Sequence, residues 1–111
     1  MKLSLINIAL LIAAAAPGAL AQSPNQPIRI LVPITAGGGP DLAARIIGPR
    51  LSELLGRPVV VENRVGANGN IAGQLVAQSA PDGRTLLLST DSLIVVNRHL
   101  YKKMPFDSLR D

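Results

Sequence analysis

Polar residues and glycines gather in three short stretches of this sequence, and each stretch follows an apolar run. The first stretch, Ile34 to Asp41, contains three consecutive glycines, and the second, Asn63 to Asn70, contains two more. The third is Thr90-Asp91-Ser92. Glycine-rich backbone that leads into a helix combines unpaired N–H groups with the positive end of the helix dipole. The first two stretches therefore predict a binding site for an anion.

The spacing of the first glycines does not fit the common phosphate motifs. A Walker loop needs Gly-Lys-Ser/Thr, but Gly39 is followed by Pro40-Asp41. A dinucleotide fingerprint needs a third glycine where Leu42 stands. The charge of Asp41 at the helix mouth would also repel a phosphate. A smaller anion, carried by a ligand that can use Asp41 as an acceptor, fits this stretch better.

The apolar runs predict the elements that position these stretches. Strands are expected at Ile28 to Pro33, Val59 to Glu62 and Thr85 to Ser89, because each run is short, β-prone and almost unbroken. Apolar residues at helical spacing predict helices at Asp41 to Leu55 and Asn70 to Ser79. The order β-α-β-α-β with short connections indicates an α/β fold with a parallel sheet and right-handed crossovers. Ligands of such sheets bind beyond the carboxyl ends of the strands.

Two details concern the first helix. Gly48-Pro49 places a proline in its interior, where the missing N–H and the ring cost about 3 kcal/mol. The apolar pattern continues in phase beyond the proline, so we expect one bent helix that ends at Gly56.

Composition limits the classes of partner. The chain has 111 residues, enough for one small domain, and its single Phe, single Tyr and lack of Trp require an aliphatic core. Few aromatic residues also argue against stacking on single-stranded nucleic acid. The net charge of +4 comes from scattered basic residues and predicts a solvated surface with no nucleic-acid-binding stripe.

The N-terminus predicts export. Lys2 precedes an apolar run from Leu3 to Ala16, and Ala19-Leu20-Ala21 has the small-residue pattern of a cleavage site. The run is shorter than the roughly 20 residues that cross a bilayer. We therefore expect a signal peptide at residues 1–21, no stable membrane anchor after cleavage, and a mature chain of residues 22–111 in the bacterial periplasm.

No cofactor or metal site is indicated. The sequence has no cysteine, and its only histidine, His99, has no acidic cluster nearby. A metal site or a catalytic base would need such partners.

Four motifs in order resemble the N-terminal part of the solute-binding receptors of tripartite tricarboxylate transporters, the Bug family. They are "AGGGPD", "PVVVENR" leading to "GANGNI", "APDGRTLLL" and "LYKKMPFD". The resemblance implies the first domain of a two-domain, Venus-flytrap binding protein in which the second domain is absent. Its partners would be a small carboxylate-bearing solute and a membrane permease, and it would not be an enzyme.

The resemblance also implies which residues bind the solute. In the family, backbone N–H groups and ordered water of the first two loops hold a carboxylate. The third loop is expected beside them because segments that follow parallel strands gather at one edge. The ligand-binding residues expected on this basis are Thr35, Ala36, Gly37, Gly38, Gly39, Asp41, Gly66, Asn68, Gly69, Asn70, Thr90 and Ser92. Three of them could instead serve the fold alone: Asp41 could stabilise the helix dipole, and Thr90 and Ser92 could cap the next segment. Asn63 and Arg64 are expected to order the second loop.

The sequence departs from the family pattern at several positions. Pro40 replaces a usual Ser or Thr, Val65 a common proline, Asn68 a common glycine, and Gly48-Pro49 ordinary helix formers. The family also continues well beyond Asp111. We expect a fragment or a truncated gene product rather than a small binding module, with impaired binding.

A second hypothesis is an exported α/β hydrolase-like enzyme that uses the glycine loops as an oxyanion hole. That activity needs a nucleophile and a base. The sequence has no G-x-S-x-G elbow and no well-placed partner for His99. The binding-protein hypothesis is therefore preferred.

Overall fold

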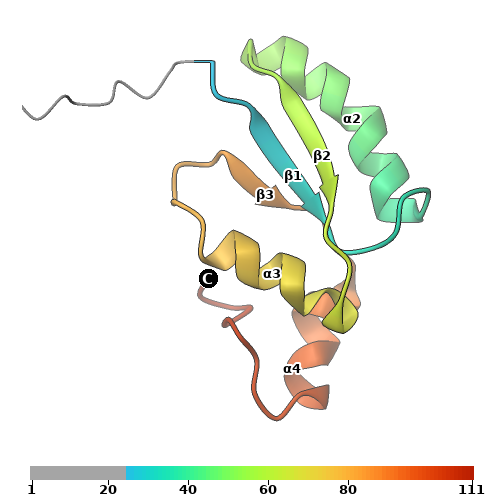
Figure 1. Ribbon diagram of the computed structural model, residues 1–111, viewed down its shortest axis with the longest axis vertical. Helices are drawn as coiled ribbons and strands as arrows, with labels where there is room; N and C mark the ends of the chain where they lie inside the picture. Colours follow the sequence, from blue (N-terminus) through green and yellow to red (C-terminus); the bar gives the residue numbers. More distant parts are fainter. Residues whose placement is uncertain (1–24) are drawn as a thin grey trace, which may run out of the picture.

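A three-stranded parallel sheet lies at the centre of the structure, a computed structural model that describes residues 25–111 (Figure 1). The strands are β1 (Ile28–Val32), β2 (Val59–Asn63) and β3 (Thr85–Leu87), in the order β2-β1-β3. The predicted parallel sheet is confirmed, with a third strand shorter than expected. The signal peptide expected at residues 1–21 lies outside the described residues.

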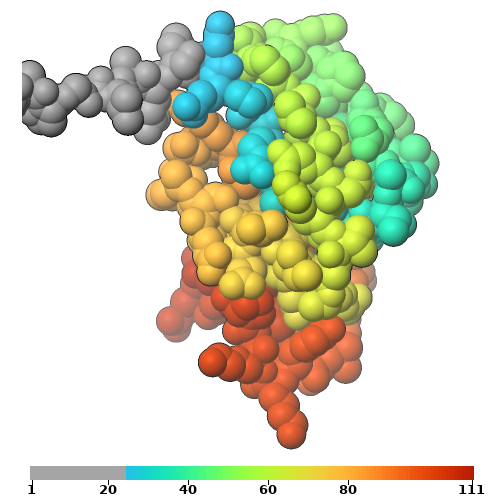
Figure 2. Space-filling view, in the orientation of Figure 1, coloured from blue at the N-terminus to red at the C-terminus, as the bar shows by residue number. Residues whose placement is uncertain are grey.

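Two helices connect the strands close to the predicted positions. Helix α2 (Gly39–Leu55) contacts β1 and β2, and helix α3 (Asn70–Ala77) contacts β1 and β3. The chain moves from β1 to one neighbour and then back past β1 to the other, so right-handed crossovers put the two helices on opposite faces of the sheet. Figure 2 shows the face of the sheet on which α3 lies. The yellow surface of α3 covers one part of this face, and β1 is visible as a blue strip between β2 and β3 where α3 does not reach.

The core is aliphatic and centred on β1. Ile30, Leu31 and Val32 are almost fully buried, as a central parallel strand with helices on both faces requires. Side chains alternate along a strand, so Ile30 and Val32 share one face and Leu31 lies on the other. Ile30 and Val32 form a cluster with Ala44 of α2.

The buried face of α2 is not the one that its large apolar residues indicate. Ala44 and Gly48 are buried, whereas Ile46 and Leu54 are 75% and 68% exposed. Small residues one turn apart let the helix lie close to β2. A Cβ added at Gly48 would be 3.6 Å from Val59 Cγ1. The periodicity correctly predicts a helix, but the side chains that produce it largely face away from the sheet.

The ends of α2 follow from backbone chemistry. Pro40 lies in the first turn, where a missing N–H has no cost, and Gly56 ends the helix in the left-handed region at φ 61°. The helix continues through Pro49, so one helix rather than two is confirmed.

The chain after β3 forms helical structure that the sequence does not predict. A π-helical turn, η2 (Ser92–Val96), leads directly into α4 (Asn97–Leu100). Tyr101 to Lys103, which follow α4, are exposed. Within residues 25–111, no helix has the length and apolar character needed to cross a bilayer.

Replacing Pro49 by alanine is expected to stabilise the protein by about 1–3 kcal/mol, because alanine restores the N–H that an interior helical position uses. Chemical denaturation measures this change. Pro40→Ala is the matched control, and it should change stability little because the first turn has no intrahelical acceptor for that N–H. Equal effects of the two substitutions would contradict this account of α2.

Candidate ligand-binding pocket

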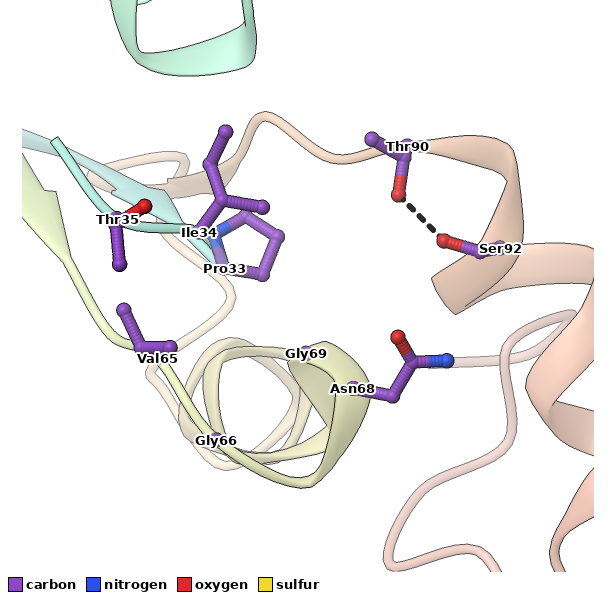
Figure 3. Close-up of a pocket in the computed structure, with 9 residues that line it drawn as sticks. All are labelled: Pro33, Ile34, Thr35, Val65, Gly66, Asn68, Gly69, Thr90 and Ser92. Atoms are coloured by element: carbon purple, nitrogen blue, oxygen red, sulfur yellow. Dashed lines mark hydrogen bonds between the residues drawn. The ribbon is translucent and has the colours of Figure 1, made fainter. Parts of the chain in front are cut away.

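A pocket of about 330 Å³ lies at the carboxyl edge of the sheet (Figure 3). Parallel strands end at the same edge, so the segments that follow β1, β2 and β3 meet there. All three segments contribute to the pocket, as the sequence predicts. The lining residues are Pro33, Ile34, Thr35, Val65, Gly66, Asn68, Gly69, Thr90 and Ser92.

The polar part of the pocket consists of neutral groups. Thr35, Thr90 and Ser92 contribute hydroxyls, and the hydroxyl oxygens of Thr90 and Ser92 are 2.7 Å apart. A hydroxyl donates one hydrogen bond and rotates to suit its acceptor. None of the lining residues carries a formal charge. An anion in this pocket would therefore be held by hydroxyls, backbone N–H groups and water rather than by an ion pair.

Apolar residues that the sequence analysis did not select form another part of the wall. Pro33 and Ile34 directly follow β1, and Val65 follows β2. Their position in the sequence could have identified them as pocket residues, because the first residues after a parallel strand lie at the edge where ligands bind. Ile34 and Val65 are in contact with both the pocket and solvent, so they are available to the apolar part of a ligand.

The turn that leads into α3 has an unusual backbone. Gly66, Ala67, Asn68 and Gly69 all have positive φ, at 137°, 46°, 53° and 90°. Asparagine tolerates this region better than most residues, whereas alanine does so at a cost of order 1–3 kcal/mol. The N–H of Gly69 donates to the carbonyl of Gly66 at 2.9 Å and closes the turn. Figure 3 shows this turn, with Gly66, Asn68 and Gly69, directly below the pocket.

Asn97 holds this turn in place, a role that the sequence analysis missed. Its side chain is fully buried, and its Nδ2 donates to the backbone oxygen of Asn68 at 2.9 Å and to Oδ1 of Asn70 at 2.8 Å. Its Oδ1 accepts from Nδ2 of Asn68. Asn97 is remote in sequence from the turn, and nothing in its sequence neighbourhood indicates this contact. Asn70, predicted to bind ligand, is buried in this network and does not line the pocket.

The first glycine loop encloses an anion of its own, the carboxylate of Asp41. Asp41 is 1% exposed, and it accepts hydrogen bonds from the backbone N–H of Gly37, from Nε of Arg45 and from Nδ2 of Asn63, at 2.8, 3.0 and 2.9 Å. The Arg45 guanidinium, followed by the Gly37 amide and Asn63, lowers the pKa of Asp41 to about 2. The buried carboxylate therefore fixes the conformation of the first loop through these hydrogen bonds.

Asn63 links the first loop to β2. We expected Asn63 to order the second loop, but its side-chain contacts are with the first: Nδ2 donates to the carbonyl of Ile34 at 3.0 Å as well as to Asp41. It sits at the end of β2, beside the loop that follows β1, since the two strands are parallel neighbours. Arg64 pairs with Glu62 at 2.9 Å, away from the pocket-lining residues.

The glycines of the first loop do not line the pocket. The N–H of Gly37 is used by Asp41, and the N–H of Gly38 donates to the carbonyl of Thr35 at 3.3 Å. A Cβ at position 37 would meet open space, so crowding does not require a glycine there. The backbone conformation does, because Gly37 has φ 90°. The residues of the predicted site that lie outside the pocket lining are Ala36, Gly37, Gly38, Gly39, Asp41 and Asn70.

A sequence model described as "Tripartite tricarboxylate transporter family receptor" matches residues 43–111, more than half of the chain. The chain belongs to this family. The resemblance identified from the four motifs is thereby confirmed.

Relatives and solved structures of the family agree. A UPF0065 protein of Bordetella bronchiseptica is 43% identical over 109 residues, which cover 97% of this chain and 32% of the relative. A structure described as a periplasmic transporter aligns with a TM-score of 0.75 at 41% identity, over 80% of this chain and 30% of that one. The R. palustris protein Rpa4515, solved with adipate, aligns with a TM-score of 0.72 at 40% identity, over 76% of this chain and 28% of that one. The chain spans about a third of the length of the curated relative.

Replacing Asp41 by asparagine is expected to lower the melting temperature at pH 7 by roughly 5–10 °C, because the charge-assisted hydrogen bonds to Gly37 and Arg45 are weakened. The pKa of Asp41 is depressed from 3.8 to about 2. The stabilisation is therefore complete above pH 3.8 and is lost as the pH falls toward 2. The difference between wild type and variant should shrink across this window, as measured by thermal unfolding at each pH.

Glu62, whose pKa Arg29 also lowers to about 2, is present in both proteins and cancels in the difference. Glu53→Gln is the control, because the Glu53 side chain is 67% exposed and its partner Arg50 lies at the surface. A difference between wild type and Asp41→Asn that stayed constant from pH 7 to pH 2 would contradict the role assigned to this carboxylate.

Proposed function

We propose that this chain provides a carboxylate-binding part of a periplasmic solute-binding receptor of a tripartite tricarboxylate-type transporter. The observation that carries the proposal is the pocket in which three strand-following loops bring together hydroxyls and glycine backbone without a charged side chain. Membership of the receptor family and the likeness to a protein solved with adipate support it. Residues 1–21 would act as the signal peptide, and residues 22–111 would form part of the N-terminal domain of a two-domain protein.

The binding chemistry follows from the groups that face the pocket. A carboxylate accepts up to four hydrogen bonds; Thr35 can donate one, and the Thr90–Ser92 pair, whose hydroxyls share a hydrogen bond, can donate another. The Gly66–Gly69 turn places backbone at the pocket immediately before α3, where the helix dipole favours negative charge. Ordered water can bridge the remaining distance with little loss of affinity. Ile34 and Val65 would contact the carbon skeleton of the solute.

The residues of the first glycine loop have a supporting role in this proposal. Asp41 would hold Gly37 and the segment around it, so that the nearby Thr35 keeps a fixed position at the pocket. A pre-organised loop binds more tightly because less conformational entropy is lost on binding. Asn70 would support the second loop in the same way, through Asn97.

The receptor would deliver the solute to a membrane permease and would not catalyse a reaction. The hydroxyl of Ser92, which a hydrolase could use as a nucleophile, is hydrogen bonded to Thr90 rather than to an imidazole. His99 lies exposed on α4. A nucleophile without an adjacent base is weak, so the arrangement favours binding over acyl transfer.

Carboxylic acids are expected to raise the melting temperature of the purified chain in a saturable way. A ligand at ten times its Kd stabilises the folded state by about 1.4 kcal/mol, or roughly 5–10 °C for a domain of this size. The pocket is open to solvent at Thr35, Val65 and Asn68, so we expect weak binding, with adipate, succinate and citrate tested at millimolar concentrations. Thr90→Val removes a hydroxyl and should raise the Kd for the carboxylic acid about tenfold.

Ser79→Ala is the matched control for the loss of a hydroxyl. Ser79 lies just past the C-terminal end of α3, and its hydroxyl donates to the Leu75 carbonyl, away from the pocket. The proposal fails if no carboxylate shifts the melting temperature, or if Thr90→Val and Ser79→Ala bind alike.

The absence of turnover is tested separately with a chromogenic ester. We expect no hydrolysis above the buffer rate. Activity that disappears in a His99→Ala variant would establish the hydrolase alternative instead.

A further inference from the structure

Asn68 presents a hydrogen-bond acceptor to the pocket. Among the described residues that line the pocket, it is the one with a side-chain amide. Its Nδ2 donates to Oδ1 of Asn97. Figure 3 shows the amide oxygen directed across the pocket toward the side where Thr90 and Ser92 lie, and the nitrogen directed away.

The orientation of this amide is set by Asn97. Nδ2 of Asn97 donates to two oxygens, the backbone oxygen of Asn68 and Oδ1 of Asn70, so its own Oδ1 remains as the acceptor. Asn97 is fully buried, where an unpaired oxygen would be costly. The group that satisfies this oxygen must be a donor, and Asn68 therefore turns its NH₂ toward Asn97. Its carbonyl oxygen is left for the pocket.

A fixed acceptor changes what the pocket can distinguish. The hydroxyls of Thr35, Thr90 and Ser92 can donate to a carboxylate, but a carbonyl oxygen cannot. Near Asn68, a carboxylate or a methylene gains no hydrogen bond, whereas a hydroxyl or an ammonium group does. A site that offers a polar partner disfavours a ligand that lacks the matching group, because its own group then loses water without compensation.

We propose that Asn68 is a specificity-determining residue of the pocket, and that it selects carboxylic acids carrying a hydroxyl or ammonium donor over acids of the same length without one. This inference rests on the proposed function and assigns the class of solute within it. Asn97 is the positioning residue that fixes the amide of Asn68.

The backbone of the turn makes a clean test possible. Asn68 has φ 53°, a conformation that glycine adopts without strain. Asn68→Gly therefore removes the acceptor without straining the backbone of the turn, and water that enters in place of the side chain can donate to Oδ1 of Asn97. Ala67, at φ 46°, is also left-handed but does not line the pocket. Ala67→Gly relaxes the same turn and keeps the amide of Asn68, which makes it the matched control.

Three four-carbon dicarboxylates serve as probes: succinate, L-malate with one added hydroxyl, and L-aspartate with one added ammonium group. Their affinities are measured by isothermal titration calorimetry on the wild-type chain and both variants. Wild type and Ala67→Gly should bind malate and aspartate about fivefold more tightly than succinate, the effect of one net hydrogen bond. Asn68→Gly should bind all three acids within about twofold of one another.

The outcomes separate this inference from the proposed function. Equal affinities of the wild-type chain for the three acids would overturn the inference and leave carboxylate binding intact. A preference that survives in Asn68→Gly, or that disappears in Ala67→Gly, would also overturn it, because the amide would then not be its source. A preference for only one of malate and aspartate would support it and identify the donor. Failure of all three acids to bind would overturn the inference, and it would overturn the proposed function as well only if adipate and citrate also leave the melting temperature unchanged.

Discussion

The pairing of β1 with a parallel strand on each side is the constraint on which the rest of this structure depends. Ile30 pairs with Val61 on one side and with Leu86 on the other. Because all three strands run the same way, every connection between them must cross a face of the sheet, and every strand ends at the same edge. The pocket forms at this edge because the loops that follow β1, β2 and β3 all begin there.

The loops at this edge are held by internal polar contacts rather than by packing alone. Asp41 fixes the loop after β1 and is joined to the end of β2 through Asn63. Asn97 fixes the turn after β2 and belongs to the helical segment after β3. Each contact therefore ties one loop to another part of the chain. Gly69 contributes in a different way, since a Cβ there would be 3.0 Å from Pro33 and 3.4 Å from Leu93. This close contact joins the three loops beneath the pocket.

Such an arrangement suits a receptor that must recognise a small polar solute. The buried polar groups are paired with one another, so they would not compete for a ligand, whereas the Thr35 hydroxyl and the Asn68 oxygen face the pocket. Pre-organised neutral groups also let a charged solute leave again, because no strong ion pair has to be broken. In the proposed receptor, a negative solute would be held without an ion pair.

The amino-acid sequence alone predicted the strands, the two connecting helices, their parallel order and the edge where the pocket lies. These follow from local chemistry: apolar runs predict buried strands, Gly56 ends a helix, and glycines mark the turns. Which residues face the pocket became clear from the three-dimensional arrangement. Gly37 and Asp41 satisfy each other, Ile46 faces solvent, and Asn97 reaches a turn far away in sequence. Side-chain direction and hydrogen-bond partners depend on which segments the fold brings together, and no local pattern contains that information.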